Sequence, residues 1–286
     1  MSIIVKDLKH IYSKNGPFER VALNNISFTI DDGEFIGLIG HTGSGKSTLV
    51  EHLNGLLKPD SGQIIIDGID ITDKKCKLTE IRSKVGLVFQ YPEYQLFEET
   101  VYKDIAYGPS NMNLSQDEIK RRVFDAAQFV GLDSSILDSS PFDLSGGQKR
   151  RVAIAGVLAM EPKVLILDEP TAGLDPAGRN DLLERLKHLH KEKGITIILV
   201  SHSMEDIADT VERVMVMSEG ELVAFDTINN IFAQSNLLKK IGLDVPQICS
   251  VIDYLKSKGY SFPESVCTVE DTADIIFDII KGAHNA

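Results

Sequence analysis

The feature that most constrains the fold is a glycine-rich loop at residues 40–47, Gly-His-Thr-Gly-Ser-Gly-Lys-Ser, which fits G-x-x-x-x-G-K-[ST] without a mismatch. An apolar run at residues 35–39, typical of a buried strand, precedes it. Residues 46–57 then carry the periodicity of a helix. Glycines let backbone N–H groups point inward, and the N-terminus of the next helix attracts anions, so the loop can bind phosphates. The pattern predicts that Lys46 reaches the β- and γ-phosphates of a nucleotide and that the Ser47 hydroxyl ligates Mg²⁺.

A second apolar run ends in two carboxylates. Residues 164–167, Val-Leu-Ile-Leu, are typical of a buried strand and are followed by Asp168 and Glu169. In α/β folds, ligands bind at the carboxyl ends of such strands. Alone, this pair would more often be solvated. Beside a phosphate loop, Asp168 is expected to hold Mg²⁺ and Glu169 to orient or deprotonate an attacking water.

A third segment, residues 144–148, Leu-Ser-Gly-Gly-Gln, also exposes its backbone at the start of a predicted helix, which makes a second anion-binding N-terminus. With these three motifs, the chain resembles the nucleotide-binding subunit of ATP-binding-cassette (ABC) transporters. In that family the third segment contacts the γ-phosphate of ATP held by the opposite subunit. The resemblance therefore implies a head-to-tail dimer around two ATPs, and it assigns the contact to Ser145, Gly146, Gly147 and Gln148.

The same resemblance implies the other site residues. Tyr12 lies where the family stacks an aromatic on adenine, and Gln90 where a glutamine touches Mg²⁺ beside Ser47 and Asp168. Asp175 matches the loop that communicates across the dimer, and His202 matches a histidine that contacts the γ-phosphate and steadies Glu169. The residues expected to bind ATP are Tyr12, Gly40, His41, Thr42, Gly43, Ser44, Gly45, Lys46, Ser47, Thr48 and Gln90. The remaining histidines, His188 and His190 among them, are expected to be solvated.

Strand and helix patterns alternate along most of the chain, which predicts an α/β fold. The family implies an ABC cassette at residues 1–225, a P-loop NTPase with a RecA-like mixed sheet, an antiparallel β subdomain and an inserted helical subdomain at about residues 92–160. Residues 226–286 are expected to form a small helical extension. In it, a helix should run from Pro246 to Lys258, and a capping-box-like segment at residues 268–271 should precede a helix at 275–280.

Residues 89–109, 149–156 and 242–247 narrow the resemblance to the ATPases of energy-coupling factor (ECF) transporters, of the second or A-prime type. Such transporters import vitamins and transition-metal ions. This implies a second ABC ATPase subunit (a paralogue or an identical chain), a polytopic transmembrane coupling protein and a substrate-binding membrane component. The chain would then be a peripheral ATPase on the cytoplasmic face of the cell membrane. The alternative is the ATPase of a dedicated cobalt or nickel importer that works as a homodimer.

Composition excludes other classes. A net charge of −12 over 286 residues argues against a duplex-DNA binder, and we expect no nucleic-acid partner. ABC-type DNA-repair ATPases separate the phosphate loop from the Leu-Ser-Gly-Gly-Gln segment by long coiled coils, whereas here only about 100 residues lie between them. Ribosome-associated ABC proteins carry two cassettes in one chain, whereas this sequence shows one.

Scattered cysteines and the lack of a secretory pattern or a bilayer-length apolar run suggest a cytosolic protein. Intact motifs argue against a non-hydrolysing regulatory subunit.

Overall fold

The apolar runs predicted around the phosphate loop come together in one six-stranded sheet of the order β10-β9-β3-β8-β7-β6. In this computed structural model, which describes residues 1–262, 272–273 and 275–277, β10 and β9 form an antiparallel hairpin. All other neighbouring pairs in the sheet are parallel. The strands are β3 (Phe35–Gly40), β6 (Val85–Val88), β7 (Val164–Asp168), β8 (Thr196–Val200), β9 (Arg213–Ser218) and β10 (Glu221–Thr227).

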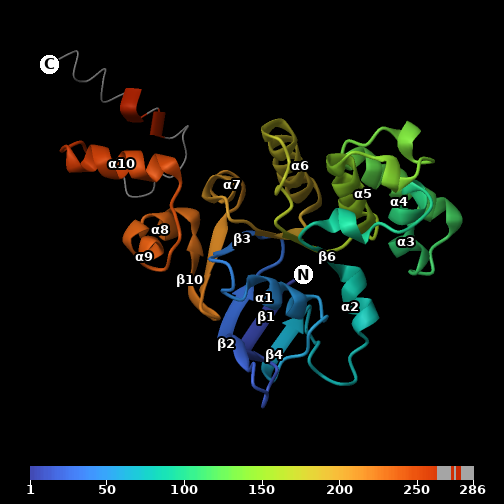
Figure 1. The fold of residues 1–286 in the computed structure, drawn as a ribbon, viewed down its shortest axis with the longest axis horizontal. Coiled ribbons are helices and arrows are strands. Elements are labelled where there is room, and N and C mark those ends of the chain that lie inside the picture. Colours follow the sequence, from blue (N-terminus) through green and yellow to red (C-terminus); the bar gives the residue numbers. More distant parts are fainter. Residues whose placement is uncertain (263–271, 274, 278–286) are drawn as a thin grey trace.

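A smaller antiparallel sheet of the order β2-β1-β4-β5 lies beneath the large one (Figure 1). Its strands are β1 (Ile3–Tyr12), β2 (Arg20–Ile30), β4 (Ser61–Ile66) and β5 (Ile69–Asp70). Helix α1 (Lys46–Leu53) leaves the phosphate loop between the two sheets. The mixed sheet and the antiparallel subdomain confirm the predicted fold class.

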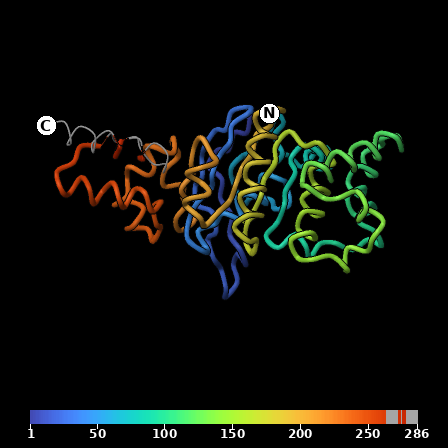
Figure 2. Tube along the Cα trace, turned by 90° about the horizontal axis from the view of Figure 1, so that it is seen from above, coloured from blue at the N-terminus to red at the C-terminus, as the bar shows by residue number. Residues whose placement is uncertain are grey.

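Helices cluster between β6 and β7, where a helical region was expected. They are η1 (Pro92–Gln95), α3 (Val101–Ser110), α4 (Gln116–Phe129), η2 (Ser134–Ile136), η3 (Pro141–Asp143) and α5 (Gly146–Leu158). Helix α2 (Leu78–Lys84) precedes β6. Helices α6 (Pro176–Lys193) and α7 (Met204–Thr210) follow β7 and β8. Figure 2 shows the inserted helices and the C-terminal helices at opposite ends of the molecule, with the sheets between them.

The large sheet separates two apolar cores, which explains why its strands are apolar throughout. In β7, Leu165 and Leu167 belong to the core shared with the helices. Their neighbours Val164 and Ile166 face the other core, shared with α1 and the antiparallel sheet. Because side chains alternate across a strand, a strand buried on both faces needs apolar residues at every position.

The C-terminal helices are α8 (Ile228–Phe232), α9 (Ser235–Lys240) and α10 (Gln247–Ser257). Ile231 and Phe232 of α8 and Cys249 of α10 are buried in the same core as α6. Helix α10 begins and ends within a residue of its predicted bounds, after Pro246 and before Lys258. The boundary predicted after residue 225 stays a prediction, and β10 runs across it to Thr227. The predicted capping segment at 268–271 and residues 278–280 of the last predicted helix lie outside the described residues, whereas 275–277 are helical.

Two details of the sequence prediction were wrong. The helix expected over residues 46–57 ends at Leu53, because Gly55 adopts φ +71°, and Leu56 is 44% exposed. The remaining histidines are not all solvated. His10 and His52 are buried, with ring centroids 4.7 Å apart. His190 is largely buried as well, because the last turn of α6 places its Nδ1 2.9 Å from the carbonyl oxygen of Ile195.

Candidate functional site

Four neighbouring strands end at one edge of the large sheet, and most of the predicted site residues follow them. The phosphate loop follows β3, and His202 follows β8. Asp168 ends β7 with Glu169 directly after it, and Gln90 follows β6. These strands are adjacent and parallel in the order β3-β8-β7-β6. The sheet therefore brings together segments far apart in the sequence, at the edge where α/β folds bind ligands.

The phosphate loop needs glycine because of its close contacts with neighbouring backbone. Gly45 has φ +103°, and a Cβ there would lie 2.6 Å from the carbonyl oxygen of Ala22. Lys46 follows at the first position of α1 and is buried. Its ammonium group donates to the carbonyl oxygens of Gly40 (2.6 Å) and His41 (3.2 Å). The lysine thus folds back over its own loop.

Two oxygen groups meet where the loop faces β7. The Ser47 hydroxyl donates to Asp168 Oδ2 at 3.0 Å. Burial raises the pKa of Asp168, an effect partly offset by the Ser47 hydrogen bond and the Lys46 charge. Burial also lowers the pKa of Lys46, while the two carboxylates nearby act in the opposite direction. These groups therefore influence each other's charge, as a cation–anion cluster beside a phosphate site should.

Glu169 lies in an unusual local environment. Its backbone is left-handed, with φ +53°, a conformation that is uncommon for a non-glycine residue and often found at functional sites. Burial raises the pKa of its carboxyl group to about 7, despite a hydrogen bond from the backbone of His202. Its Oε1 atom has no hydrogen-bond partner among the described residues. A buried carboxyl group with an unused acceptor is suited to receive a proton from water.

His202 lies beside this carboxyl group. Its Nε2 atom is 3.3 Å from Glu169 Oε1, close enough for an ion pair but without the alignment of a hydrogen bond. Burial and the Lys46 charge lower the pKa of His202. The imidazole is half exposed and is therefore accessible to a ligand on the phosphate loop.

Tyr12 flanks the phosphate loop from the antiparallel sheet. Its hydroxyl group lies 3.2 Å from Thr48 Oγ1, and the tyrosine is 39% exposed. Tyr12, Lys46 and Ser47 line one cavity of about 150 Å³. Sequence reasoning missed Arg20 of β2, which lines the same cavity and donates to the carbonyl oxygen of Gly43 at 3.0 Å. A single arginine at the start of a strand carries no motif that could have indicated this contact.

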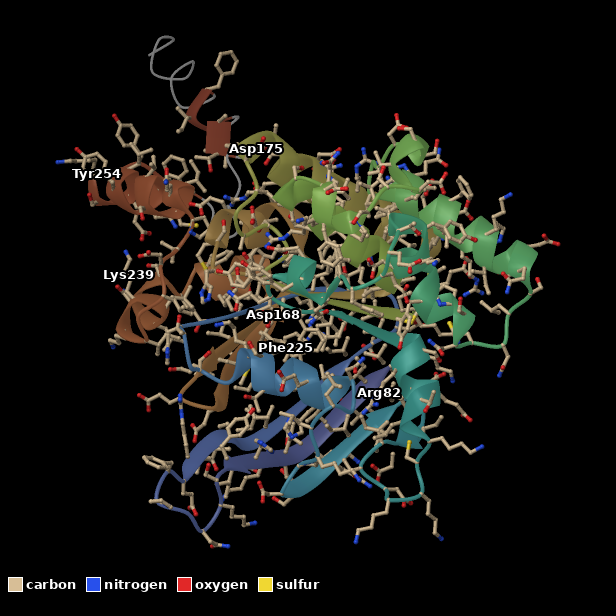
Figure 3. The ribbon with its side chains drawn as sticks, turned by 45° about the vertical axis from the view of Figure 1, so that its right-hand side comes forward. Arg82, Asp168, Asp175, Phe225, Lys239 and Tyr254 are labelled. Atoms are coloured by element: carbon tan, nitrogen blue, oxygen red, sulfur yellow. The ribbon has the colours of Figure 1, made fainter. Side chains whose placement is uncertain are left out.

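The Leu-Ser-Gly-Gly-Gln segment lies apart from the phosphate loop in the structure. Ser145 caps α5 in a reciprocal capping box with Gln148. Ser145, Gly147, Gln148 and Asp175 line a hollow of about 650 Å³, and none of the described residues lining it comes from the phosphate loop. Asp175 also caps α6, accepting from the Gly178 N–H at 2.6 Å. Figure 3 shows Asp175 well apart from Asp168. Within one chain, this hollow and the phosphate loop are separate sites.

Comparisons with known proteins match this architecture. The model of the ABC transporter family matches residues 23–172. An energy-coupling factor transporter ATP-binding protein, EcfA2, from Clostridium perfringens is 59% identical over 98% of this chain and 99% of its own length. The EcfA2 protein from Caldanaerobacter subterraneus subsp. tengcongensis is 54% identical over all of both chains.

Solved structures agree. The structure of cbiO1 from Clostridium perfringens, part of the ABC transporter complex cbiONQ, has a TM-score of 0.73 and 41% identity, and the match covers 88% of this chain and 98% of that one. The ATP-binding cassette MJ0796, dimeric in a post-hydrolysis state with ADP and Pi, has a TM-score of 0.73 and 31% identity, over 79% of this chain and 98% of that one. With nearly full-length relatives, a matching cassette fold and the phosphate-loop geometry all in agreement, this chain belongs to the ABC transporter ATPases and, among them, to the EcfA2-type ATP-binding subunits of energy-coupling factor transporters.

Proposed function

We propose that this ATPase binds ATP between Tyr12 and the phosphate loop and hydrolyses it with Glu169 as the base. The observation that carries the proposal is the cluster at the sheet edge, where Ser47 contacts Asp168 and His202 approaches Glu169 to 3.3 Å. The adenine stacks on Tyr12, and residues 40–48 surround the phosphates with their backbone N–H groups. Lys46 exchanges the carbonyl oxygens of Gly40 and His41 for the β- and γ-phosphate oxygens.

The donors near Ser47 suit a magnesium ion that is shared with a nucleotide. A hydroxyl and a carboxylate lie 3.0 Å apart, and both are hard oxygen ligands. Gln90, which follows the adjacent strand β6, would add an amide oxygen. Mg²⁺ is commonly bound by one or two protein carboxylates together with substrate phosphates and water, which fits this small donor set. Mg²⁺ bound by Ser47, Asp168 and Gln90 would neutralise charge on the transferred phosphoryl group.

The catalytic step requires little covalent chemistry from the protein. Glu169 accepts a proton from the attacking water through its unpartnered Oε1. His202 holds the carboxylate in place and contacts the γ-phosphate. Catalysis comes from positioning and from charges already in place before the reaction.

A second ATPase subunit completes each site. Ser145, Gly147 and Gln148 line a hollow apart from the phosphate loop of the same chain, so the segment 145–148 would cap the γ-phosphate on a partner's loop. Asp175 lines that hollow and would contact the partner near its nucleotide. The dimeric MJ0796 structure and the cbiONQ complex of the cbiO1 protein support such assembly.

Membrane partners would couple hydrolysis to transport. None of the helices in the described ranges is long and apolar enough to span a bilayer. A groove of about 600 Å³ runs beside the Gln90 segment, lined by Leu56, Phe89, Leu96, Phe97 and Tyr107. Its apolar lining suits a helix of the polytopic coupling protein, which would in turn hold the substrate-binding component. The chain would act at the cytoplasmic face of the membrane in uptake of vitamins or metal ions. The alternative is the ATPase of a dedicated cobalt or nickel importer that works as a homodimer.

Replacing Glu169 by Gln tests the proposal. Gln has the same shape but cannot accept the proton, so steady-state hydrolysis should fall by about a hundredfold or more, whereas ATP affinity should stay within about twofold. Hydrolysis is measured by phosphate release and affinity by titration with a fluorescent ATP analogue. Glu184→Gln, which changes an exposed carboxylate on α6, is the matched control and should have no effect. Full activity of Glu169→Gln would end the catalytic assignment.

A further inference from the structure

One buried arginine links three parts of the nucleotide site. Arg150 lies on α5, five residues after Ser145, and only 5% of its side chain is exposed. Its Nε and Nη2 atoms donate to the two carboxylate oxygens of Glu93 at 3.2 and 3.1 Å. Its Nη1 atom lies 3.5 Å from the carbonyl oxygen of Pro170, to which it donates. All three contacts come from one planar group, whose donors have a fixed geometry.

Arg150 and its two partners, Glu93 and Pro170, belong to three different functional segments. Glu93 is on η1, three residues after Gln90, and Pro170 follows Glu169 directly. Helix α5 begins with the residues proposed to cap a partner's ATP. The guanidinium group therefore connects the Gln90 segment, the backbone next to the proposed base and the helix that carries the capping residues.

The segment after Gln90 has an uncommon backbone conformation. Tyr91, between Gln90 and η1, has φ +54° although it is not glycine. Its ring centroid lies 6.0 Å from the Arg150 guanidinium carbon, in cation–π geometry. Glu93 itself is mostly buried. A buried ion pair contributes little net stability, so its role is better explained by the geometry that it fixes.

We propose that the Arg150–Glu93 pair is a positioning element for hydrolysis. It fixes the positions of Gln90 and Glu169 relative to the capping helix α5. These residues and α5 therefore move as a unit when the helical region shifts. The proposal rests on the proposed role of Glu169. Loss of the pair leaves ATP binding intact, because neither residue lines the cavity between Tyr12 and the phosphate loop, and it lowers the rate of the chemical step.

A double-mutant cycle tests this in the full-length chain assembled with its partner subunits. The variants are Glu93→Gln, Arg150→Gln and both together, with Glu184→Gln as control. Each single change should lower kcat about ten- to a hundredfold while the Kd for ATP stays within about twofold. The double variant should lose no more than the worse single variant, because both changes remove one interaction. Arg150→Lys should behave like Arg150→Gln, since an ammonium group cannot form the two parallel hydrogen bonds.

Rates are expressed per titrated ATP site, so a fraction of unfolded protein does not count as slow catalysis. Unchanged kcat in both single variants, or losses that multiply in the double variant, would overturn the positioning role. Glu169→Gln is assayed in parallel. If that variant hydrolyses ATP normally, the proposed function fails, whatever the cycle gives. If it is inactive and the cycle shows no coupling, the positioning proposal alone fails.

Discussion

At the scale of single residues, the site depends on a carboxyl group that is half protonated near neutral pH. Burial raises the pKa of Glu169 to about 7 in the free protein, and only the ionised form can accept a proton. We therefore expect kcat/KM to rise with pH through about 7 and to level off above it. The measurement is steady-state ATP hydrolysis at saturating Mg²⁺ across that range.

The pH dependence of ATP binding separates titration of Glu169 from titration of the nucleotide and of other groups. Burial lowers the pKa of Lys46, whereas the Glu169 and Asp168 carboxylates nearby act to raise it. If the acid limb belongs to Glu169 acting as the base, the affinity for ATP should change less over this pH range than kcat/KM does. An acid limb of equal size in both experiments would assign the titration to the substrate or to another group, and Glu169 would lose its role in the profile.

The sequence predicted those site residues that belong to a motif and missed those that do not. Lys46, Ser47 and Asp168 belong to two spaced patterns, and the structure brings Ser47 and Asp168 to 3.0 Å. Arg20 and Arg150 were not predicted as site residues. Their contacts, with Gly43 and Glu93, join elements that pair only in three dimensions, and no local pattern records such pairing.

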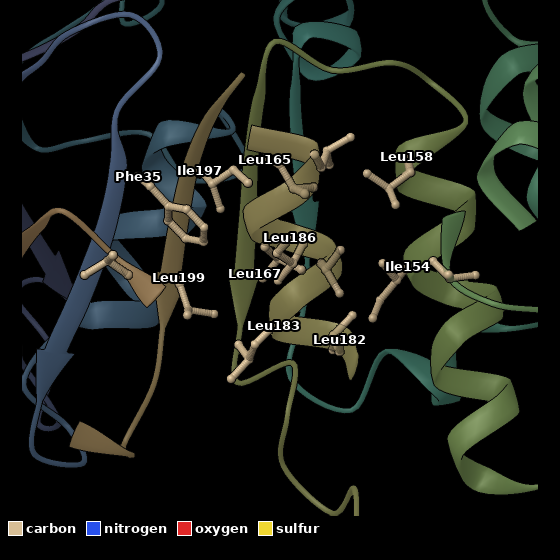
Figure 4. Packing of buried hydrophobic residues seen from close by; sticks show 14 of the residues in the cluster. Phe35, Ile154, Leu158, Leu165, Leu167, Leu182, Leu183, Leu186, Ile197 and Leu199 are labelled. Atoms are coloured by element: carbon tan, nitrogen blue, oxygen red, sulfur yellow. The ribbon is translucent and has the colours of Figure 1, made fainter. Parts of the chain in front are cut away.

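At the scale of elements, helix α6 shows what the packing of the site requires. Leu186 is fully buried and lies between β7, which carries Asp168, and α5 (Figure 4). Leu186→Ala should lower the free energy of unfolding by about 2 to 5 kcal/mol, because the surrounding side chains cannot fill the cavity completely. Denaturant unfolding of the isolated chain measures this.

The matched control comes from a helix that ends early. Periodicity placed Leu56 on the buried side of the helix after the phosphate loop, but Gly55 at φ +71° ends α1 and leaves Leu56 exposed. Leu56→Ala should therefore cost no more than about 0.5 kcal/mol. Equal losses in the two variants would mean that the interior around α6 does not determine stability. Periodicity predicted the helix after the phosphate loop, but a single glycine ended it before Leu56.

At the scale of the whole molecule, the fold class was predictable because the central strands are apolar on both faces. Such strands occur where a sheet separates two layers, and here β7 divides its residues between two cores. The packing of α8 and α10 into one of those cores was not predictable, because their short amphipathic patterns do not indicate which surface they cover.

The whole assembly yields the sharpest prediction. If each site joins the phosphate loop of one subunit to Ser145 of the other, then Lys46→Ala and Ser145→Arg damage two sites when one subunit carries both. They damage a single site when Lys46→Ala is in one subunit and the matching serine is changed in the other. Dimers of differently tagged subunits, purified in each arrangement, should therefore differ in ATP hydrolysis. The divided arrangement keeps one intact site and up to about half of the activity, whereas the combined arrangement should retain a few per cent or less.

The comparison is balanced, because both dimers contain the same two substitutions, and any general loss of folding or dimerisation affects both. Only the pairing of the damaged parts differs. The reverse order, with the combined arrangement the more active, would mean that Ser145 acts on the nucleotide of its own chain, which its place in a hollow apart from the phosphate loop argues against. Equal rates would mean that Ser145 contributes to neither site. A higher rate in the divided arrangement would mean that Ser145 acts on the partner's nucleotide. The Arg150–Glu93 pair would then join the helix that caps one subunit's ATP to the segment that follows Gln90 in the other site.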